Sequence, residues 1–149
     1  MKSLFQREAL DEVLARIEKL QPASQRVWGK MDAAQMMAHC SATFEVASGR
    51  VVLPRMFIGR ILGPFLRAHF TNDKPFAKNG PTHPTFVMTE PRDFAREREQ
   101  LKDLVRRFHE GGEEKCTRHP HAFFGPLTPQ QWGIGMYKHL DHHLTQFGV

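Results

Sequence analysis

The chain of 149 residues is 40% hydrophobic and 25% charged, a composition that predicts one ordered globular domain over residues 1–149 and excludes disordered and fibrous classes. Its 21 basic residues exceed the 16 acidic residues and give a net charge of +5. Because the two signs are interleaved rather than clustered, we expect no nucleic-acid partner.

The N-terminal region becomes charged at Lys2 and Arg7, before any apolar signal segment can form, and no run of 18 apolar residues occurs in the chain. We therefore expect neither secretion nor a membrane-spanning helix. The only cysteines, Cys40 and Cys116, form no CxxC pair, so the sequence offers neither a disulfide framework nor a zinc ribbon. These features predict a cytoplasmic protein without a membrane partner.

The first half of the chain predicts two strong helices. Apolar residues recur at steps of three and four over residues 5–20, which is typical of an amphipathic helix. Asp32 is a good N-cap for a second helix over residues 33–48, and Gly49 supplies its stop. The apolar residues of this second helix are Met36, Met37, Cys40, Phe44 and Ala47.

Residues 51–70 are apolar on almost every side and predict an additional helix, which begins near Pro54 and is interrupted near Gly63-Pro64. We expect this segment to cap the other helices or to form a subunit contact, as in a homodimer. Contact of its arginines with acidic lipid heads in a membrane interface is the second alternative. The arginines are Arg50, Arg55, Arg60 and Arg67.

Turn signals in residues 71–90 predict a long loop, a kind of segment that often carries function. Pro91 opens a third strong helix, which has a charged, solvated face and ends at Gly111-Gly112. Thr128-Pro129 marks the start of the last helix. The sequence thus predicts an all-α fold, a four-helix bundle with an additional helical segment between the second and third helices.

Three of the nine histidines lie close together in the last helix, as His139, His142 and His143. At 100° per residue, the apolar residues of the last helix fall on one inward arc of its surface. His143 lies within this arc, His139 lies at its edge and His142 lies about 60° further out. Imidazoles at positions i and i+4 can share one divalent ion, although partly buried histidines bonded to the backbone are an equal alternative. The inward apolar residues are Trp132, Met136, Leu140, Leu144 and Phe147.

A third ligand would favour the metal site, and the second helix offers His39 and Cys40. Periodicity favours Cys40 as the more inward of the two, so spacing alone does not select His39. Less regular segments offer the remaining candidates. These are His69, His83, His119 and His121.

A family resemblance selects among these candidates. A tryptophan before the second helix, the segment Ala33-Ala34-Gln35-Met36-Met37-Ala38-His39 and a last helix with His-x-x-x-His resemble the DinB / YfiT-like superfamily of metal-binding four-helix bundles. The resemblance implies that one metal ion is bound by three histidines. They are His39, His139 and His143.

The closing part of the chain has a narrower resemblance. Residues 121–128, Trp132 and residues 137–148 resemble a branch of the superfamily that is catalogued as a domain of unknown function. The likeness extends over nearly the whole chain. One departure is Ala122, which stands where that branch is expected to have proline.

Three histidine ligands leave one position of a tetrahedral ion open, as in catalytic sites; zinc or nickel is expected, with iron as an alternative. Because members of the resembled superfamily include thiol-dependent S-transferases, the resemblance implies an enzyme that joins a low-molecular-weight thiol to a small electrophilic substrate. The alternatives are a metal-dependent hydrolase and a non-catalytic metal-binding or structural domain, in which Cys40 closes the site. Otherwise Cys40 is expected to be a small core residue. No residue pattern predicts a separate catalytic group.

Four further residues are expected around the site or its pocket. His142 and Gln146 lie on the flank of the last helix and could orient a ligand histidine or contact a bound group. His121, with Phe123-Phe124, could fold over the open position. Trp132 is expected to pack near the same core.

Overall fold

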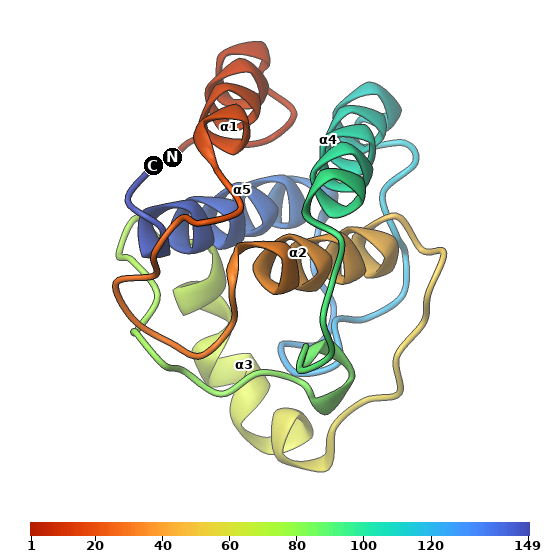
Figure 1. The fold of residues 1–149 in the computed structure, drawn as a ribbon. Helices are drawn as coiled ribbons and strands as arrows, with labels where there is room; N and C mark the ends of the chain where they lie inside the picture. The colour runs from red at the N-terminus through yellow and green to blue at the C-terminus, as the bar shows by residue number, and fades with distance from the viewer.

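The computed structural model describes all 149 residues and contains five α-helices, a short 3₁₀ turn and no β-strand (Figure 1). The predicted all-α class is therefore confirmed. The elements are α1 (Arg7–Lys19), α2 (Ala33–Ala47), α3 (Phe57–Thr71), η1 (Pro84–Phe86), α4 (Phe94–Gly111) and α5 (Pro129–Gln146).

Side-chain caps define where three of the helices begin. Asp32 and Thr128 each form a capping box with the glutamine three residues later, which fixes the starts of α2 and α5 where they were predicted. The start of α4 differs from the prediction. Asp93 accepts a hydrogen bond from the backbone N–H of Arg96, so α4 begins at Phe94 and Pro91 lies in the preceding loop.

The core lies among α1, α2, α4 and α5. In Figure 1, α2 and α5 run side by side across the middle of the molecule, and α1 and α4 cover them on one side. A cluster of 21 buried residues fills the space between these four helices and includes Cys40, Trp132 and the other inward residues predicted for α5. This packing holds α2 and α5 against each other.

The charged face of α4 is less solvated than predicted. Lys102 and Glu97 are both more than nine-tenths buried. The Lys102 ammonium pairs with Glu18 of α1 and lies 3.1 Å from a carboxylate oxygen of Glu99, while Glu97 lies 3.6 Å from the Arg92 guanidinium. Burial of these charges is tolerated because each has an opposite charge beside it.

Helix α3 lies apart from this core, on the side opposite α1 and α4, and α5 is the only helix that it contacts (Figure 1). It packs through small residues. A Cβ atom added at Gly63 would lie 2.1 Å from the carbonyl oxygen of Phe123, so only glycine allows this approach. Pro64 stands inside α3 without interrupting it, contrary to the prediction, and Pro54 lies before its first turn.

The large apolar side chains of α3 point outward, so the helix covers α5 through its small residues and Phe70 and not through its apolar stripe. Phe57 and Phe65 are 79% and 82% exposed. The packing face is formed by Gly59, Gly63 and Phe70, and a hydrophobicity pattern does not mark the two glycines as inward. A bilayer-crossing helix is absent from the fold, since no helix combines the required length with sufficient hydropathy.

Candidate metal centre

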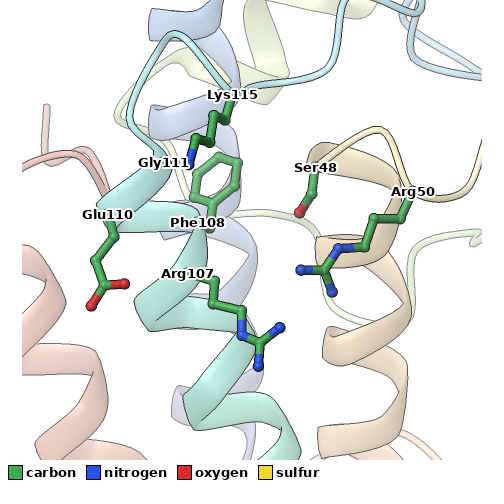
Figure 2. A pocket seen from close by; sticks show the side chains of 7 residues that line it. All are labelled: Ser48, Arg50, Arg107, Phe108, Glu110, Gly111 and Lys115. Carbon is green, nitrogen blue, oxygen red and sulfur yellow. The ribbon is translucent and has the colours of Figure 1, made fainter.

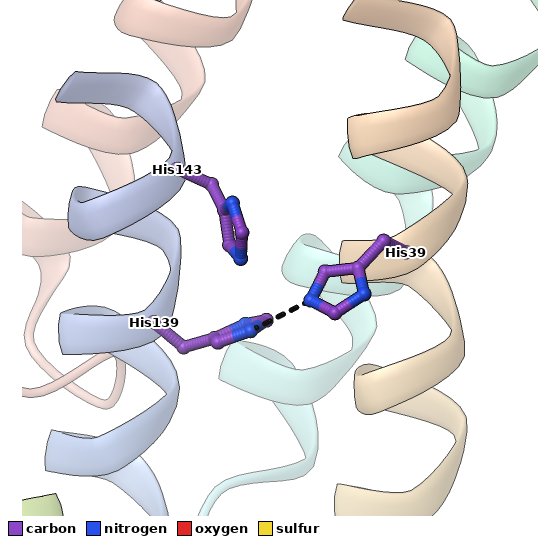
Figure 3. Close-up of side chains that lie close together, drawn as sticks. All are labelled: His39, His139 and His143. Atoms are coloured by element: carbon purple, nitrogen blue, oxygen red, sulfur yellow. Dashed lines mark hydrogen bonds between the residues drawn. The ribbon is translucent and has the colours of Figure 1, made fainter. Parts of the chain in front are cut away.

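Two helices bring three histidines together. His139 and His143 lie one turn apart on α5, and His39 faces them from α2 (Figure 3). The Nε2 atoms of His39 and His139 are 3.1 Å apart, and one ring nitrogen from each histidine lies within 4.8 Å of the others. The group could therefore hold a metal ion through three imidazoles.

The orientation of His39 is fixed by the long loop between α3 and α4. Its Nδ1 atom donates a hydrogen bond to the backbone carbonyl of Phe86 in η1, at 2.8 Å. The ring proton of neutral His39 is thus held at Nδ1. Its Nε2 atom therefore carries no proton and directs its lone pair toward His139. That lone pair can accept either a proton from His139 or a cation.

His143 is oriented by a chain of hydrogen bonds that ends in the loop before α2. The Nε2 atom of Gln146 donates to the Trp28 carbonyl at 2.7 Å, which leaves Oε1 to accept from Nδ1 of His143 at 2.9 Å. The Nε2 lone pair of His143 therefore faces the other two histidines. Gln146 thus orients His143, and its role behind a metal ligand stays a prediction.

His139 has a weaker support from α2. Its Nδ1 atom lies 3.5 Å from the hydroxyl of Thr43, and that hydroxyl donates to the Cys40 carbonyl at 2.7 Å. The remaining lone pair of the hydroxyl is therefore available to Nδ1–H of His139. Each of the three rings has a partner on its Nδ1 side and directs Nε2 inward.

Burial keeps the three imidazoles neutral. It lowers the pKa of His39, and it lowers the pKa of His143 to about 3. The pKa of His139 is held well below its ordinary value by burial and by the neighbouring His143 and His39. Neutral imidazole is the form that ligates a metal, so protons do not compete for these nitrogens near pH 7.

The donor set fits a divalent ion with one open position. Zn–N bonds of about 2.0–2.1 Å place tetrahedral ligand atoms roughly 3.3 Å apart, close to the separation of the His39 and His139 nitrogens. Cys40 does not belong to the group, because its thiol is fully buried against the Met36 sulfur, and burial raises its pKa far above the ordinary value. No fourth protein ligand closes the cluster.

The other predicted residues take different positions. His142 lies outside the group, with its ring 5.5 Å from that of Trp28 and 5.9 Å from that of Phe76. His121 packs against Trp132 at 5.4 Å, and its Nδ1 atom accepts hydrogen bonds from two backbone N–H groups of its own turn. Both His121 and Trp132 therefore hold the fold together in this structure.

Sequence reasoning missed two of the supporting groups. Thr43 lies four residues after His39 on the same face of α2, and this spacing could have identified it. The Phe86 carbonyl could not have been found, because a backbone acceptor in a loop leaves no side-chain signal. The loop of residues 71–90 was predicted to carry function, and its contact with the site is this hydrogen bond from His39.

Two hollows lie away from the histidines. One, of about 290 Å³, lies between the C-terminal ends of α2 and α4 and is bordered by Arg50, Arg107 and Lys115 (Figure 2). Arg50 lies 3.4 Å from Glu45 and Arg107 lies 2.8 Å from Asp103, so both arginines already have acidic partners. The other, of about 530 Å³, lies between α2, η1 and the start of α4. Neither is lined by a residue of the histidine group.

Comparison with known protein families gives one match. The family described as "Protein of unknown function (DUF1569)" matches residues 2–148. The chain belongs to this family. Among curated proteins and among solved structures, nothing matches the chain. Membership of DUF1569 confirms the prediction of a domain of unknown function and assigns no activity.

Proposed function

We propose that this DUF1569 protein binds one divalent metal ion through Nε2 of His39, His139 and His143, and that the loaded protein is an enzyme. The observation that carries the proposal is the orientation of the three rings. Each has a hydrogen-bond partner on its Nδ1 side and turns a neutral nitrogen toward a common point. Structural histidines do not need such convergence, whereas metal ligands do.

The chemistry that fits best is transfer of a low-molecular-weight thiol to a small electrophile, in a four-helix bundle of the DinB / YfiT-like kind. When bound, a zinc or nickel ion with an open position supplies Lewis-acid chemistry that lowers the pKa of an approaching thiol or water. The absence of Cys40 from the cluster supports a catalytic rather than a closed structural site. Free, buried cysteines are consistent with a reducing compartment, so we propose the cytoplasm.

Cobalt substitution followed by thiol titration tests this proposal. Co²⁺ added to the metal-free protein should give the visible spectrum of a four-coordinate ion at one equivalent per chain. Glutathione, used as the probe thiol, should then add a sulfur charge-transfer band, and the loaded protein should accelerate its reaction with a small alkyl halide. His109→Ala is the control variant, since the Nδ1 atom of His109 donates to the Leu4 carbonyl and His109 lies outside the histidine group.

Three results distinguish the alternatives. Loss of the band and of the acceleration in His143→Ala, with both retained in His109→Ala, supports the thiol transferase. A cobalt spectrum that thiols do not change, together with ester hydrolysis by the loaded protein, would replace thiol transfer by hydrolysis. A cobalt spectrum with neither reaction would reduce the proposal to a metal-binding domain.

A further inference from the structure

The outward face of α3 is the largest feature of the molecule that the histidine group does not explain. Its exposed apolar side chains cover about 180° of the helix at 100° per residue, over a helix about 22 Å long. Soluble monomers rarely expose a contiguous apolar surface of this size. The face consists of Phe57, Ile58, Ile61, Leu62, Phe65 and Leu66.

We propose that this face is the interface of a homodimer, in which α3 packs antiparallel against α3 of a second copy. This inference does not depend on the metal site. Aromatic side chains carry about 150–250 Å² each, so two nearly free phenylalanines and four half-exposed aliphatic residues approach the roughly 800 Å² that each partner of a standard interface buries. A two-fold axis makes one such face complementary to itself.

The charges of α3 favour a second copy over an anionic lipid surface. Arg60 and Arg67 lie outside the apolar arc, so two copies can meet without opposing like charges. Arg67 donates to the Phe124 carbonyl, and Arg55 donates to the carbonyls of His121 and Gly59. These two guanidinium groups are directed at the protein and not outward to lipid phosphates, while Arg60 is exposed and leaves one cation beside the face.

The helix is also held firmly enough to serve as an interface. Gly59 and Gly63 press its backbone onto residues 122–124, and the Phe70 ring fills the space above Gly135 of α5. Because α3 is anchored along its inner side, its outer side chains are presented in a fixed arrangement. Binding then costs little ordering of the backbone.

Light scattering after size-exclusion chromatography tests the interface. At micromolar concentration the wild-type mass should be twice the 17.2 kDa of one chain, and Phe65→Glu should reduce it to 17.2 kDa. Val27→Glu is the matched control, because Val27 is an apolar residue that is 68% exposed in the loop before α2. This variant should remain dimeric. A monomeric wild type, or a dimeric Phe65→Glu, would overturn the proposal.

A cysteine cross-link covers the case in which Phe65→Glu fails to fold. Phe65 lies next to the midpoint of α3 and at the centre of its apolar arc, so it should face its own copy across the two-fold axis. Oxidised Phe65→Cys should form a disulfide-linked dimer and Val27→Cys should not, while the buried native cysteines stay reduced. Equal cross-linking of both variants, or flotation of a monomer with anionic vesicles, would exclude the second copy as the occupant.

Discussion

The Nδ1 atom of His143 lies 2.9 Å from Oε1 of Gln146, less than one helical turn further along α5. Because the amide nitrogen of Gln146 is engaged by the Trp28 carbonyl, the glutamine can only accept from the imidazole. This contact fixes the tautomer of His143 and turns its Nε2 atom toward the other two histidines. It is shorter than the corresponding contact to His139, which is 3.5 Å long, and similar to the 2.8 Å contact between His39 and the Phe86 carbonyl.

Gln146→Leu should therefore weaken metal binding without removing a ligand. Loss of a hydrogen-bond partner behind a ligating histidine typically costs 10–100-fold in metal affinity, and we expect a loss of about that size. Competition with a chromophoric chelator would measure it. Gln130→Leu is the matched control, because Gln130 is exposed on the same helix and bonds only Glu113. Equal affinity in the two variants would show that Gln146 does not orient the ligand.

The sequence could predict the part of the site that lies on one helix. His139, His143 and Gln146 belong to α5, where helical spacing alone indicates which side chains share a face. His39 needed the family resemblance, because periodicity preferred Cys40. Ten of the fifteen residues of α2 are buried, including both His39 and Cys40, so this helix has no single inward stripe from which a ligand could be chosen.

The position of α3 could not be predicted from its composition. Hydrophobic pattern marks large apolar residues as inward, whereas α3 packs through Gly59 and Gly63 and exposes Phe57 and Phe65. The packing partner is the backbone of residues 122–124, which is distant in sequence and carries no pattern that matches a helix. The two backbones can approach closely because the glycines have no Cβ atom, and only the three-dimensional structure shows this contact.

Gly63→Ala should destabilise the protein although alanine favours helices. The added methyl group would meet the Phe123 carbonyl oxygen, and overpacking of this kind costs about 1–3 kcal/mol, more than the helix propensity returns. Urea unfolding would measure the change. Gly80→Ala is the control, because its Cβ would lie 3.4 Å from its nearest neighbour. An increase in stability for Gly63→Ala would contradict the observed packing of α3.

His121 should make the metal-free protein sensitive to acid. Burial, with a smaller contribution from Arg55, lowers its pKa from 6.5 to about 4, so the folded state binds fewer protons than the unfolded state. The contribution of His121 to the free energy of unfolding is therefore fully present above pH 6.5 and is lost as the pH falls from 6.5 through about 4. The contribution of this one group is at most about 3 kcal/mol.

His121→Asn tests this dependence, since the Asn Oδ1 atom can accept the same backbone N–H groups but does not titrate. The free energy of unfolding, measured in the presence of a chelator, should fall less between pH 7 and pH 5 than in the wild type. His83→Asn is the control, because Nδ1 of His83 accepts from the Thr85 N–H in a similar turn. A slope unchanged in His121→Asn would show that His121 titrates normally.

Neither cysteine should react with a thiol reagent in the folded protein. Burial raises the pKa of Cys40 above its ordinary range and the pKa of Cys116 to about 11, so almost no thiolate is present at neutral pH. Ellman's reagent should therefore modify two thiols per chain in denaturant and none without it. If the reagent instead modified the native protein rapidly, and if bound metal prevented this modification, Cys40 would belong to the site.

Metal content tests the central claim most directly. After incubation with zinc or nickel and removal of excess ion, elemental analysis should find one ion per chain in the wild type and in His109→Ala, and none in His143→Ala or His39→Ala. The control histidine binds the Leu4 carbonyl and lies outside the cluster. A wild type without metal, or equal metal in His143→Ala and His109→Ala, would contradict the three-histidine site.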